Sequence, residues 1–285
     1  MKGTNKNAGF MAYANLVVLK AAKRRKLKNP IPFYEKFFDD YHVEQYEKDV
    51  RMVLKNRQIE KIISSVNDGR IYLDVGCGVG HTLRRFPSGK FRIGIDYSQK
   101  SINIARNNLK DIVFCRASAS DIPLANGSID FITCFEVLEH LSDDTKAVRE
   151  IARILRPGGL FFLSIPSTFY FKEYEYLMGH MRHYTRPQLD KLLNENGFTI
   201  IKNMNMFPRT QTLYFWIYIQ LELYNIFLNK ITGKKKTIYQ REIPFTKIRY
   251  YETLITPFFL YISRLDNNKN RLKNSTFVLC QKAVV

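Results

Sequence analysis

The chain has 285 residues, of which 45% are hydrophobic and 25% are charged. This composition is ordinary for a globular protein, and a chain of this length buries a sizeable core without help from metals or disulfides. Its 45 Lys and Arg residues against 26 Asp and Glu residues give a formal net charge of +19. Such a surplus predicts attraction to nucleic acid or to an anionic membrane surface, unless it reflects a compositional bias of the genome.

The cysteines and the apolar segments indicate the compartment. Cys77, Cys115, Cys134 and Cys280 contain no C-x-x-C pair and three of them lie in apolar runs, which predicts reduced, buried thiols and no disulfide framework. No segment reaches the roughly 18 to 20 apolar residues that a bilayer span needs. Residues 10–19 are apolar, but their basic residues follow them, whereas a secretory signal carries its charges first. We therefore expect a cytoplasmic protein with a possible role at a membrane surface.

Composition divides the chain into four parts. Residues 1–66 are basic and helical in pattern, and residues 67–207 alternate short apolar runs with amphipathic stretches. Residues 208–275 are rich in aromatic and aliphatic side chains, and residues 276–285 contain one more apolar run. We expect the second and fourth parts to form one core, the first to end in a lid, and the third to be a long helical insertion before the last strand.

Short apolar runs predict the strands of this core. They lie at residues 71–75, 91–95, 112–115, 129–134, 160–165, 198–203 and 276–281. Helices are predicted after Ser98, from Ser142 and after the capping box that Thr185 opens, and the second should stop at the Arg-Pro-Gly-Gly turn of residues 156–159. The alternation predicts a parallel, doubly wound sheet, which binds ligands at the carboxyl ends of its strands.

A glycine-rich loop follows the first predicted strand. The strand carries Asp74 near its end and runs into Gly76, Gly78 and Gly80, which let the backbone turn tightly and approach a ligand. A dinucleotide-binding fingerprint would place its third glycine at position 81, which is His81. The spacing therefore disfavours a nicotinamide-dependent dehydrogenase, and the loop alone identifies no other ligand.

An acidic residue ends the second predicted strand. Asp96 follows Gly78 by 18 positions, and a carboxylate there can accept hydrogen bonds from both hydroxyls of a ribose. A helix-capping or turn aspartate is the structural alternative. Together with the glycine loop, Asp96 predicts a site for a ribose.

Five stretches resemble the motifs of class I S-adenosylmethionine-dependent methyltransferases in order and spacing. They are LDVGCGVG at 73–80, GIDYS at 94–98, SDIPLANGSID at 120–130, FEVLEHL at 135–141 and LRPGGL at 155–160. The resemblance implies a Rossmann-like, seven-stranded, doubly wound α/β fold with a helical N-terminal lid, and S-adenosyl-L-methionine as the cofactor. The long insertion at 208–275 departs from the family, whose last two strands are joined by a short connection.

The resemblance assigns the glycine loop to the methionine end of the cofactor. Gly76, Cys77, Gly78 and Gly80 would wrap the methionine and ribose portions. Asp74 would attract the sulfonium and the ammonium group, because a carboxylate at the strand end carries the opposite charge.

Four further positions would hold the ribose and the adenine, and a fifth would face the cofactor. Asp96 would bind the ribose, Tyr97 would pack beside the adenine, and the backbone amide of Ala119 would contact the ring. Ser118 stands where the family commonly has an acidic residue that recognises the adenine amino group, so adenine recognition departs from the family there. Phe135 would face the cofactor.

Glu136, Glu139 and His140 form an E-x-x-E-H cluster after the fourth predicted strand. Glu136 and His140 are four residues apart, so on a helix they would share a face. The similarity to ubiquinone-type O-methyltransferases implies that the cluster could bind a divalent metal or supply a base, and local packing is the alternative. We expect no metal, and His140 is a candidate catalytic residue.

The stretch GHMRHYT at 179–185 resembles an H-x-R-x-Y stretch near the active-site mouth of small-molecule and lipid methyltransferases. His180 and His183 are candidate catalytic residues, because two histidines and Arg182 beside a cofactor pocket could orient an acidic or hydroxyl-bearing substrate. A loop that packs over the core is the alternative.

The flanks suggest the kind of acceptor. Residues 213–228 contain one charged residue and the only tryptophan, and lysines follow; residues 10–28 have the same layout. This layout fits segments that lie in a membrane interface, with a buried cap or a homodimer interface as alternatives, and it disfavours nucleic acid. We expect methyl transfer to a small-molecule or lipid-linked acceptor, with oxygen favoured over nitrogen and carbon. A non-catalytic protein that keeps the fold as a membrane- or partner-binding module is the alternative.

Overall fold

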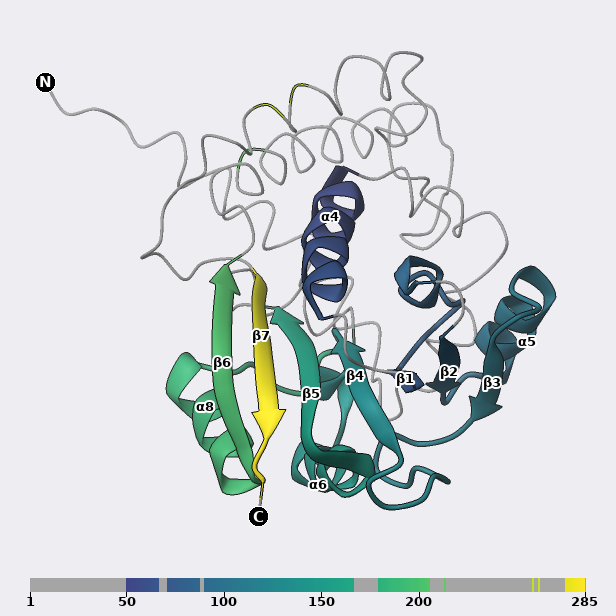
Figure 1. Cartoon of the computed structure of the whole chain (residues 1–285). Coiled ribbons are helices and arrows are strands. Elements are labelled where there is room, and N and C mark those ends of the chain that lie inside the picture. Colours follow the sequence, from purple (N-terminus) through teal and green to yellow (C-terminus); the bar gives the residue numbers. More distant parts are fainter. Residues whose placement is uncertain are drawn as a thin grey trace, which may run out of the picture.

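The computed structural model shows the core in Figure 1. It describes residues 50–66, 71–87, 90–166, 179–205 and 275–284, and the single residues Leu213, Phe258 and Tyr261. Residues 1–49, most of the N-terminal segment that was predicted to contain the lid, and most of the insertion at 208–275 therefore lie outside the described residues. Among those described, no helix is long and apolar enough to cross a bilayer.

Seven strands form one sheet in the order β3-β2-β1-β4-β5-β7-β6 (Figure 1). They are β1 (Ile71–Val75), β2 (Phe91–Asp96), β3 (Val113–Arg116), β4 (Ile129–Phe135), β5 (Leu155–Pro166), β6 (Phe198–Asn205) and β7 (Ser275–Lys282). The first five run parallel, so the Rossmann-like α/β fold is confirmed.

The last strand corrects the expectation of a fully parallel sheet. β7 lies between β5 and β6 and is antiparallel to both, with Pro166 opposite Ser275 and Asn205 opposite Thr276. A parallel strand needs a crossover that carries the chain back to the other end of the sheet. Here β7 begins at the same end of the sheet at which β6 ends, so β7 runs antiparallel to β6.

Four helices and two 3-10 turns complete the described core. They are α4 (Val50–Ser65), α5 (Gln99–Asn108), α6 (Asp144–Ile154), α8 (Arg186–Glu195), η1 (Leu83–Arg85) and η2 (Leu138–His140). Ser98 caps α5 and Thr185 opens α8 with a capping box, as predicted. The cap of α6 is Asp143, whose carboxylate accepts from the Lys146 amide at 2.8 Å, so Ser142 lies one residue outside the helix end.

The predicted helix stop at residues 156–159 is wrong. α6 already ends at Ile154, and Leu155 is the first residue of β5. The register of β5 on β4 shifts there, because Leu155 pairs with Ile129 while Leu160 pairs with Phe131. The Arg-Pro-Gly-Gly segment is thus an irregular start of a strand, and the left-handed φ of 71° at Gly158 permits the bend.

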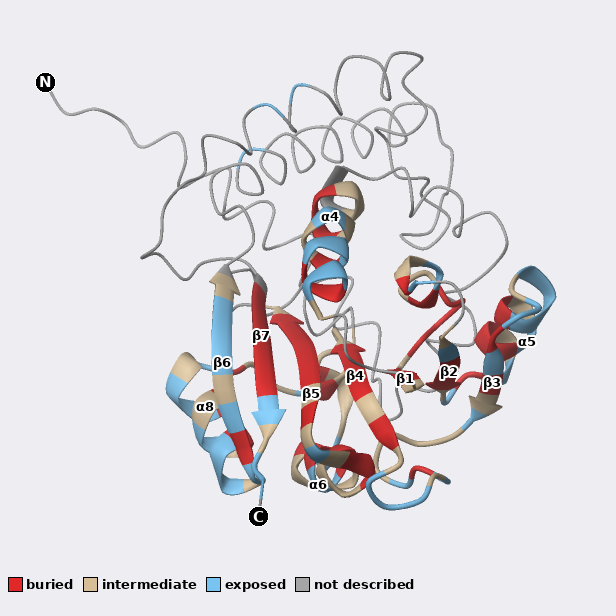
Figure 2. Cartoon of the chain, in the orientation of Figure 1, coloured by how far each residue is buried: buried red, intermediate tan, exposed pale blue. Residues whose placement is uncertain are grey.

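Both faces of the sheet are covered by helices, as the doubly wound prediction required. One core cluster joins Leu73 to residues of α6 and α8, and the other joins Tyr72 to residues of α4 and α5. Buried residues follow β4, β5 and β7 (Figure 2). The four cysteines are free, and all except the half-buried Cys115 are buried, which confirms the prediction for three of them.

Candidate active site

The glycine loop after β1 requires glycine for two reasons. Gly76, Gly78 and Gly80 have φ of 73°, 51° and 87°, in the left-handed region that side chains rarely adopt. A Cβ on Gly76 would also lie 2.3 Å from a methyl of Val137, in the turn that follows β4. The loop is therefore pressed against the segment that carries Glu139 and His140.

Asp96 fixes the loop to the start of α5. Its Oδ2 accepts a hydrogen bond from the Gly78 amide at 2.8 Å and its Oδ1 accepts one from the Ser98 amide at 2.8 Å. The amides of Gly76 and Cys77 both donate to the Ile95 carbonyl, at 2.8 and 2.9 Å. Asp96 thus lies beside the glycine loop, as predicted, and also makes the turn contacts that were its structural alternative.

Asp74 is a buried carboxylate below the loop. Its Oδ1 accepts a hydrogen bond from the Thr133 hydroxyl of β4 at 2.6 Å. Burial raises the pKa of Asp74 to about 7 and the charge of Asp96 adds to the rise, while Thr133, Thr82 and Lys55 oppose it. A cation that binds beside Asp74 would restore its negative charge, so the carboxyl suits a ligand that brings positive charge.

The predicted adenine contacts lie around the ends of β2 and β3. Tyr97 is 47% exposed, and the Arg116 guanidinium carbon is 5.4 Å from its ring centroid. The Ser118 hydroxyl accepts from the Ser120 amide at 3.2 Å, which is a local turn contact, and Ala119 packs against the core. Tyr97 follows Asp96 directly, and the contacts of Tyr97, Ser118 and Ala119 with an adenine stay predictions.

Phe135, the last residue of β4, belongs to an aromatic cluster on the α4 face of the sheet. Its ring centroid lies 5.0 Å from that of Phe162 and 5.7 Å from that of Phe277, both edge-to-face. The Lys55 ammonium of α4 is 5.8 Å from the Phe135 centroid. The cluster brings α4 to the carboxyl end of β4, and the contact of Phe135 with a cofactor stays a prediction.

The expectation that Glu136 and His140 share a helix face is wrong. Glu136 has a φ of 56°, and only residues 138–140 form a helical turn, η2. Glu136 Oε1 accepts from the Lys55 ammonium at 3.2 Å and from the Ser164 hydroxyl at 2.6 Å. Burial would raise the pKa of Glu136, but Lys55 and Ser164 outweigh it and hold the pKa below its usual value.

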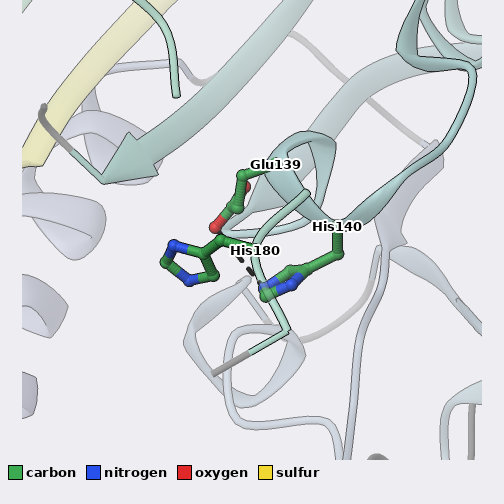
Figure 3. Close-up of side chains that lie close together, drawn as sticks. All are labelled: Glu139, His140 and His180. Atoms are coloured by element: carbon green, nitrogen blue, oxygen red, sulfur yellow. Dashed lines mark ion pairs between the residues drawn. The ribbon is translucent and has the colours of Figure 1, made fainter. Parts of the chain in front are cut away.

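Glu139, His140 and His180 lie together instead (Figure 3), and their ligand atoms are within 4.8 Å of one another. Glu139 is fully buried, and its Oε1 is 3.6 Å from His140 Nε2. The ring centroid of His180 lies 4.7 Å from that of His140 and 5.8 Å from that of His183. The three candidate catalytic histidines are thus neighbours.

The protonation of these histidines follows from their contacts. His140 Nδ1 is 3.1 Å from the Gly179 carbonyl oxygen, which can only accept, so the tautomer with its proton on Nδ1 donates to that oxygen and leaves Nε2 as the lone-pair site. Burial lowers the pKa of His140, and burial together with His140 lowers the pKa of His180 to about 4. Both rings are therefore neutral at pH 7 and can accept a proton. One carboxylate and two imidazoles are also a donor set that suits a transition metal.

The segment with His180 is fastened to the turn with His140. The Met181 amide donates to the Glu139 carbonyl at 2.8 Å, and the Tyr184 hydroxyl donates to Asp144 Oδ2 at 2.5 Å. Arg182 pairs with Asp144 and donates to the Leu141 carbonyl at 2.9 Å. Arg182 therefore positions the segment, as the alternative of a loop that packs over the core implies, and its substrate-orienting role stays a prediction.

Three residues of this region were not predicted. Thr133 and Ser164 are hydroxyls within buried strands, and Lys55 is one of many basic residues before β1. Nothing in their sequence surroundings distinguishes them. Their partners Asp74 and Glu136 lie 28 to 81 positions away in the chain and are brought to them only by the fold.

A family model described as a methyltransferase domain matches residues 46–203. The chain belongs to the class I S-adenosylmethionine-dependent methyltransferases. A Mycolicibacterium smegmatis protein named as a probable S-adenosylmethionine-dependent methyltransferase is 30% identical over 143 residues, which cover 49% of this chain and 56% of that protein. The ubiquinone biosynthesis O-methyltransferase of Thiobacillus denitrificans is 38% identical over 102 residues, 34% of this chain and 44% of that one. The chain spans about half the length of the curated relatives it matches.

Solved structures confirm the fold of this methyltransferase. Phosphoethanolamine N-methyltransferase 2 of Haemonchus contortus, in complex with S-adenosyl-L-methionine, superposes with a TM-score of 0.56 at 18% identity, over 88% of this chain and 60% of that one. The relatives named as S-adenosylmethionine-dependent methyltransferases make S-adenosylmethionine the cofactor of the family. The buried Asp74, the glycine loop and Asp96 fit it, because they offer a carboxylate for its cations and close backbone approach for its methionine and ribose.

Proposed function

We propose that this protein transfers the methyl group of S-adenosylmethionine to an oxygen of a small-molecule or lipid-linked acceptor. The observation that carries the choice of oxygen is the neutral pair His140 and His180, because His140 follows the turn in which Val137 lies against Gly76 of the glycine loop. The Thiobacillus denitrificans relative, named as an O-methyltransferase, supports the same choice.

The chemistry explains why the histidines matter. The sulfonium of the cofactor supplies the driving force for methyl transfer, and the protein aligns the acceptor with the methyl group. A hydroxyl attacks well only when it loses its proton, so a neutral imidazole within reach accelerates the step. His140 Nε2 is 3.6 Å from Oε1 of the buried Glu139, so an imidazolium formed by proton uptake at Nε2 would be stabilised by that carboxylate.

The test is to incubate the full chain with methyl-labelled S-adenosylmethionine and a total lipid and metabolite extract, and to identify the labelled product. We expect an O-methyl product from the wild type and none from Asp96→Ala. A label found only on nitrogen or carbon would contradict the choice of oxygen. If no product forms and calorimetry detects no cofactor binding, the proposal of an enzyme is wrong, and the alternative of a non-catalytic binding module is favoured.

We also propose that the protein is cytoplasmic and binds anionic membrane surfaces peripherally. The net charge of +19 and the apolar, basic layout of residues 10–28 and 213–236 support this. In the insertion, Phe258 and Tyr261 are 52% and 62% exposed. We expect co-sedimentation with anionic vesicles at low salt and none with neutral vesicles. Equal behaviour with both would contradict the proposal, and self-association in sedimentation velocity would favour a homodimer instead.

A further inference from the structure

A strap of residues 179–184 is fastened to the segment of residues 138–144, which runs from η2 into the first turn of α6. Every second side chain of the strap contacts this segment; they are His180, Arg182 and Tyr184. Between the first two, Met181 is 54% exposed. Alternate side chains of an extended chain point to one side, so the strap presents its histidine on the same side as its two anchors.

Both anchors meet on Asp144. This carboxylate is the first residue of α6 and is 7% exposed. Its Oδ1 pairs with the Arg182 guanidinium, and its Oδ2 accepts a hydrogen bond from the Tyr184 hydroxyl at 2.5 Å. Burial and the bond to Asp144 raise the pKa of Tyr184, so its hydroxyl keeps the proton that it donates. One buried carboxylate therefore holds two residues of the strap.

Arg182 makes further contacts that fix the direction of its side chain. Its guanidinium donates to the Leu141 carbonyl at 2.9 Å and to the Ser142 carbonyl at 2.6 Å. Its backbone amide donates to the Glu139 carbonyl at 3.3 Å. A lysine would reproduce the charge but not the planar fork of donors that this arrangement uses. Arg182 thus fastens the strap to the turn that carries His140.

The strap decides where the ring of His180 lies. The centroid of this ring is 4.7 Å from that of His140, the other candidate base. A general base acts only within hydrogen-bond reach of the proton that it takes, and a displacement of about 1 Å at a reacting group can cost about 100-fold in rate. A loosened strap would therefore slow methyl transfer while both histidines were still present.

We propose that Asp144 is a positioning residue that holds His180 against His140. It acts through its bonds to Arg182 and Tyr184, and none of these three residues needs to contact the acceptor. This inference rests on the proposed function, in which the two histidines serve the acceptor. One alternative is that Arg182 orients the acceptor itself, and another is that Asp144 only stabilises the fold.

Amide hydrogen exchange tests whether Asp144 holds the strap, and it needs neither cofactor nor acceptor. The variants Arg182→Met and Tyr184→Phe each remove one contact with the carboxylate. The Met181 amide reports on the strap, because it donates a hydrogen bond to the turn with His140. We expect this amide to exchange about 10- to 100-fold faster in both variants than in the wild type, since each loses a charge-assisted hydrogen bond.

The matched control is Arg186→Met, which removes an arginine and its ion pair with Asp190 inside α8. The Met181 amide should keep its wild-type exchange rate in this control. Equal exchange in the wild type, the two strap variants and the control would overturn the inference. If Arg182→Met fails to fold, Tyr184→Phe decides alone, because it removes a single oxygen atom.

The rate of methyl transfer tests the consequence for His180. With labelled S-adenosylmethionine at saturation and the lipid and metabolite extract as acceptor, Arg182→Met should lower the initial rate about 10- to 100-fold. Its dissociation constant for the cofactor should stay within about twofold, and Arg182→Lys should recover part of the rate. In a His180→Ala background, Arg182→Met should lower the rate no further, because the residue that it positions is already gone.

Three outcomes would contradict these expectations. If the losses of Arg182→Met and His180→Ala add, Arg182 acts independently of the histidine and an acceptor contact is favoured. If the Met181 amide exchanges faster but the rate of methyl transfer is unchanged, Asp144 has only a structural role. If the wild type forms no labelled product, the proposed function is wrong, and hydrogen exchange still decides whether Asp144 holds the strap.

Discussion

The Thr133 hydroxyl donates a 2.6 Å hydrogen bond to Asp74 Oδ1, which joins β1 to β4 directly below the glycine loop. Both residues are buried, so this bond is one of the forces that decide whether the carboxyl is charged. The affinity for a cationic cofactor should therefore depend on pH in a way that these two residues set.

Cofactor affinity should fall as the pH falls below about 7. In the cofactor-free protein the pKa of Asp74 is raised to about 7, and the bound cations favour its charged form, so a proton must leave on binding at lower pH. The dissociation constant should rise by up to about tenfold per pH unit below that point and stay constant above it. Calorimetry between pH 5.5 and 8.5 measures this. Asp74→Asn should bind weakly with a flat profile, and a flat wild-type profile would contradict the assignment.

The variant Thr133→Val should move that threshold to higher pH. It keeps the shape of the side chain and removes the donor that favours the charged form of Asp74. As the pH is lowered, the affinity of the variant for the cofactor should therefore start to fall at a higher pH than that of the wild type. At pH 9 the two proteins should bind the cofactor with similar affinity. The lost bond should also lower the free energy of unfolding by about 1 kcal/mol, measured in urea. An unchanged threshold would mean that the hydroxyl does not control the carboxyl.

The variants His140→Ala and His180→Ala should slow the methyl transfer without weakening the binding of the cofactor. We expect each to lower kcat by about 10²- to 10⁴-fold, because that is the usual effect of a general base. The dissociation constant for S-adenosylmethionine should stay within about twofold. Dialysis against a chelator should leave the wild-type rate unchanged. A rate that falls on chelation and returns with zinc would show that Glu139, His140 and His180 hold a metal instead.

The variant Gly76→Ala should destabilise the protein more than Gly197→Ala does. Both glycines have a positive φ, of 73° and 81°, so both variants carry the cost of a left-handed alanine, about 1 to 2 kcal/mol. A Cβ on Gly197 meets nothing within 4 Å, whereas one on Gly76 overlaps Val137. The difference between their free energies of unfolding, measured in urea, isolates that overlap. Equal losses would mean that the turn after β4 can move away from the loop.

The sheet could be predicted because buried parallel strands are continuous apolar runs between turn residues. Two local errors have physical causes. The direction of β7 depends on the end at which a long insertion re-enters the sheet, which no local pattern encodes. The Arg-Pro-Gly-Gly segment carries helix-stop residues, but pairing of Leu155 with Ile129 makes it the start of a strand.

The site was predictable where its residues are adjacent in the sequence. The segment from Asp74 to Gly80 begins in β1, and Asp96 ends the neighbouring strand β2, so the strand pairing alone brings them together. The cluster of Glu139, His140 and His180 depends on contacts between distant segments. The hydrogen bond from the Met181 amide to the Glu139 carbonyl holds the segment with His180 against the turn with His140. Glu136 instead accepts a hydrogen bond from Lys55. Burial and pairing decide these contacts, and a spacing of four residues could not reveal them.

The pairing of β6 with β7 also has a consequence for how this enzyme could change. Asn205 and Thr276 are partners on one rung of the sheet, at the same end as the carboxyl termini of β1 and β4. The pairing of β6 with β7 thus fixes Asn205 and Ser275, the two residues that flank residues 206–274. The cost of closing a loop grows slowly with its length, so this segment can be exchanged or resized at little expense to the core. A different segment could therefore be grafted between Asn205 and Thr276 while the strands that carry Asp74 and Asp96 stay as they are.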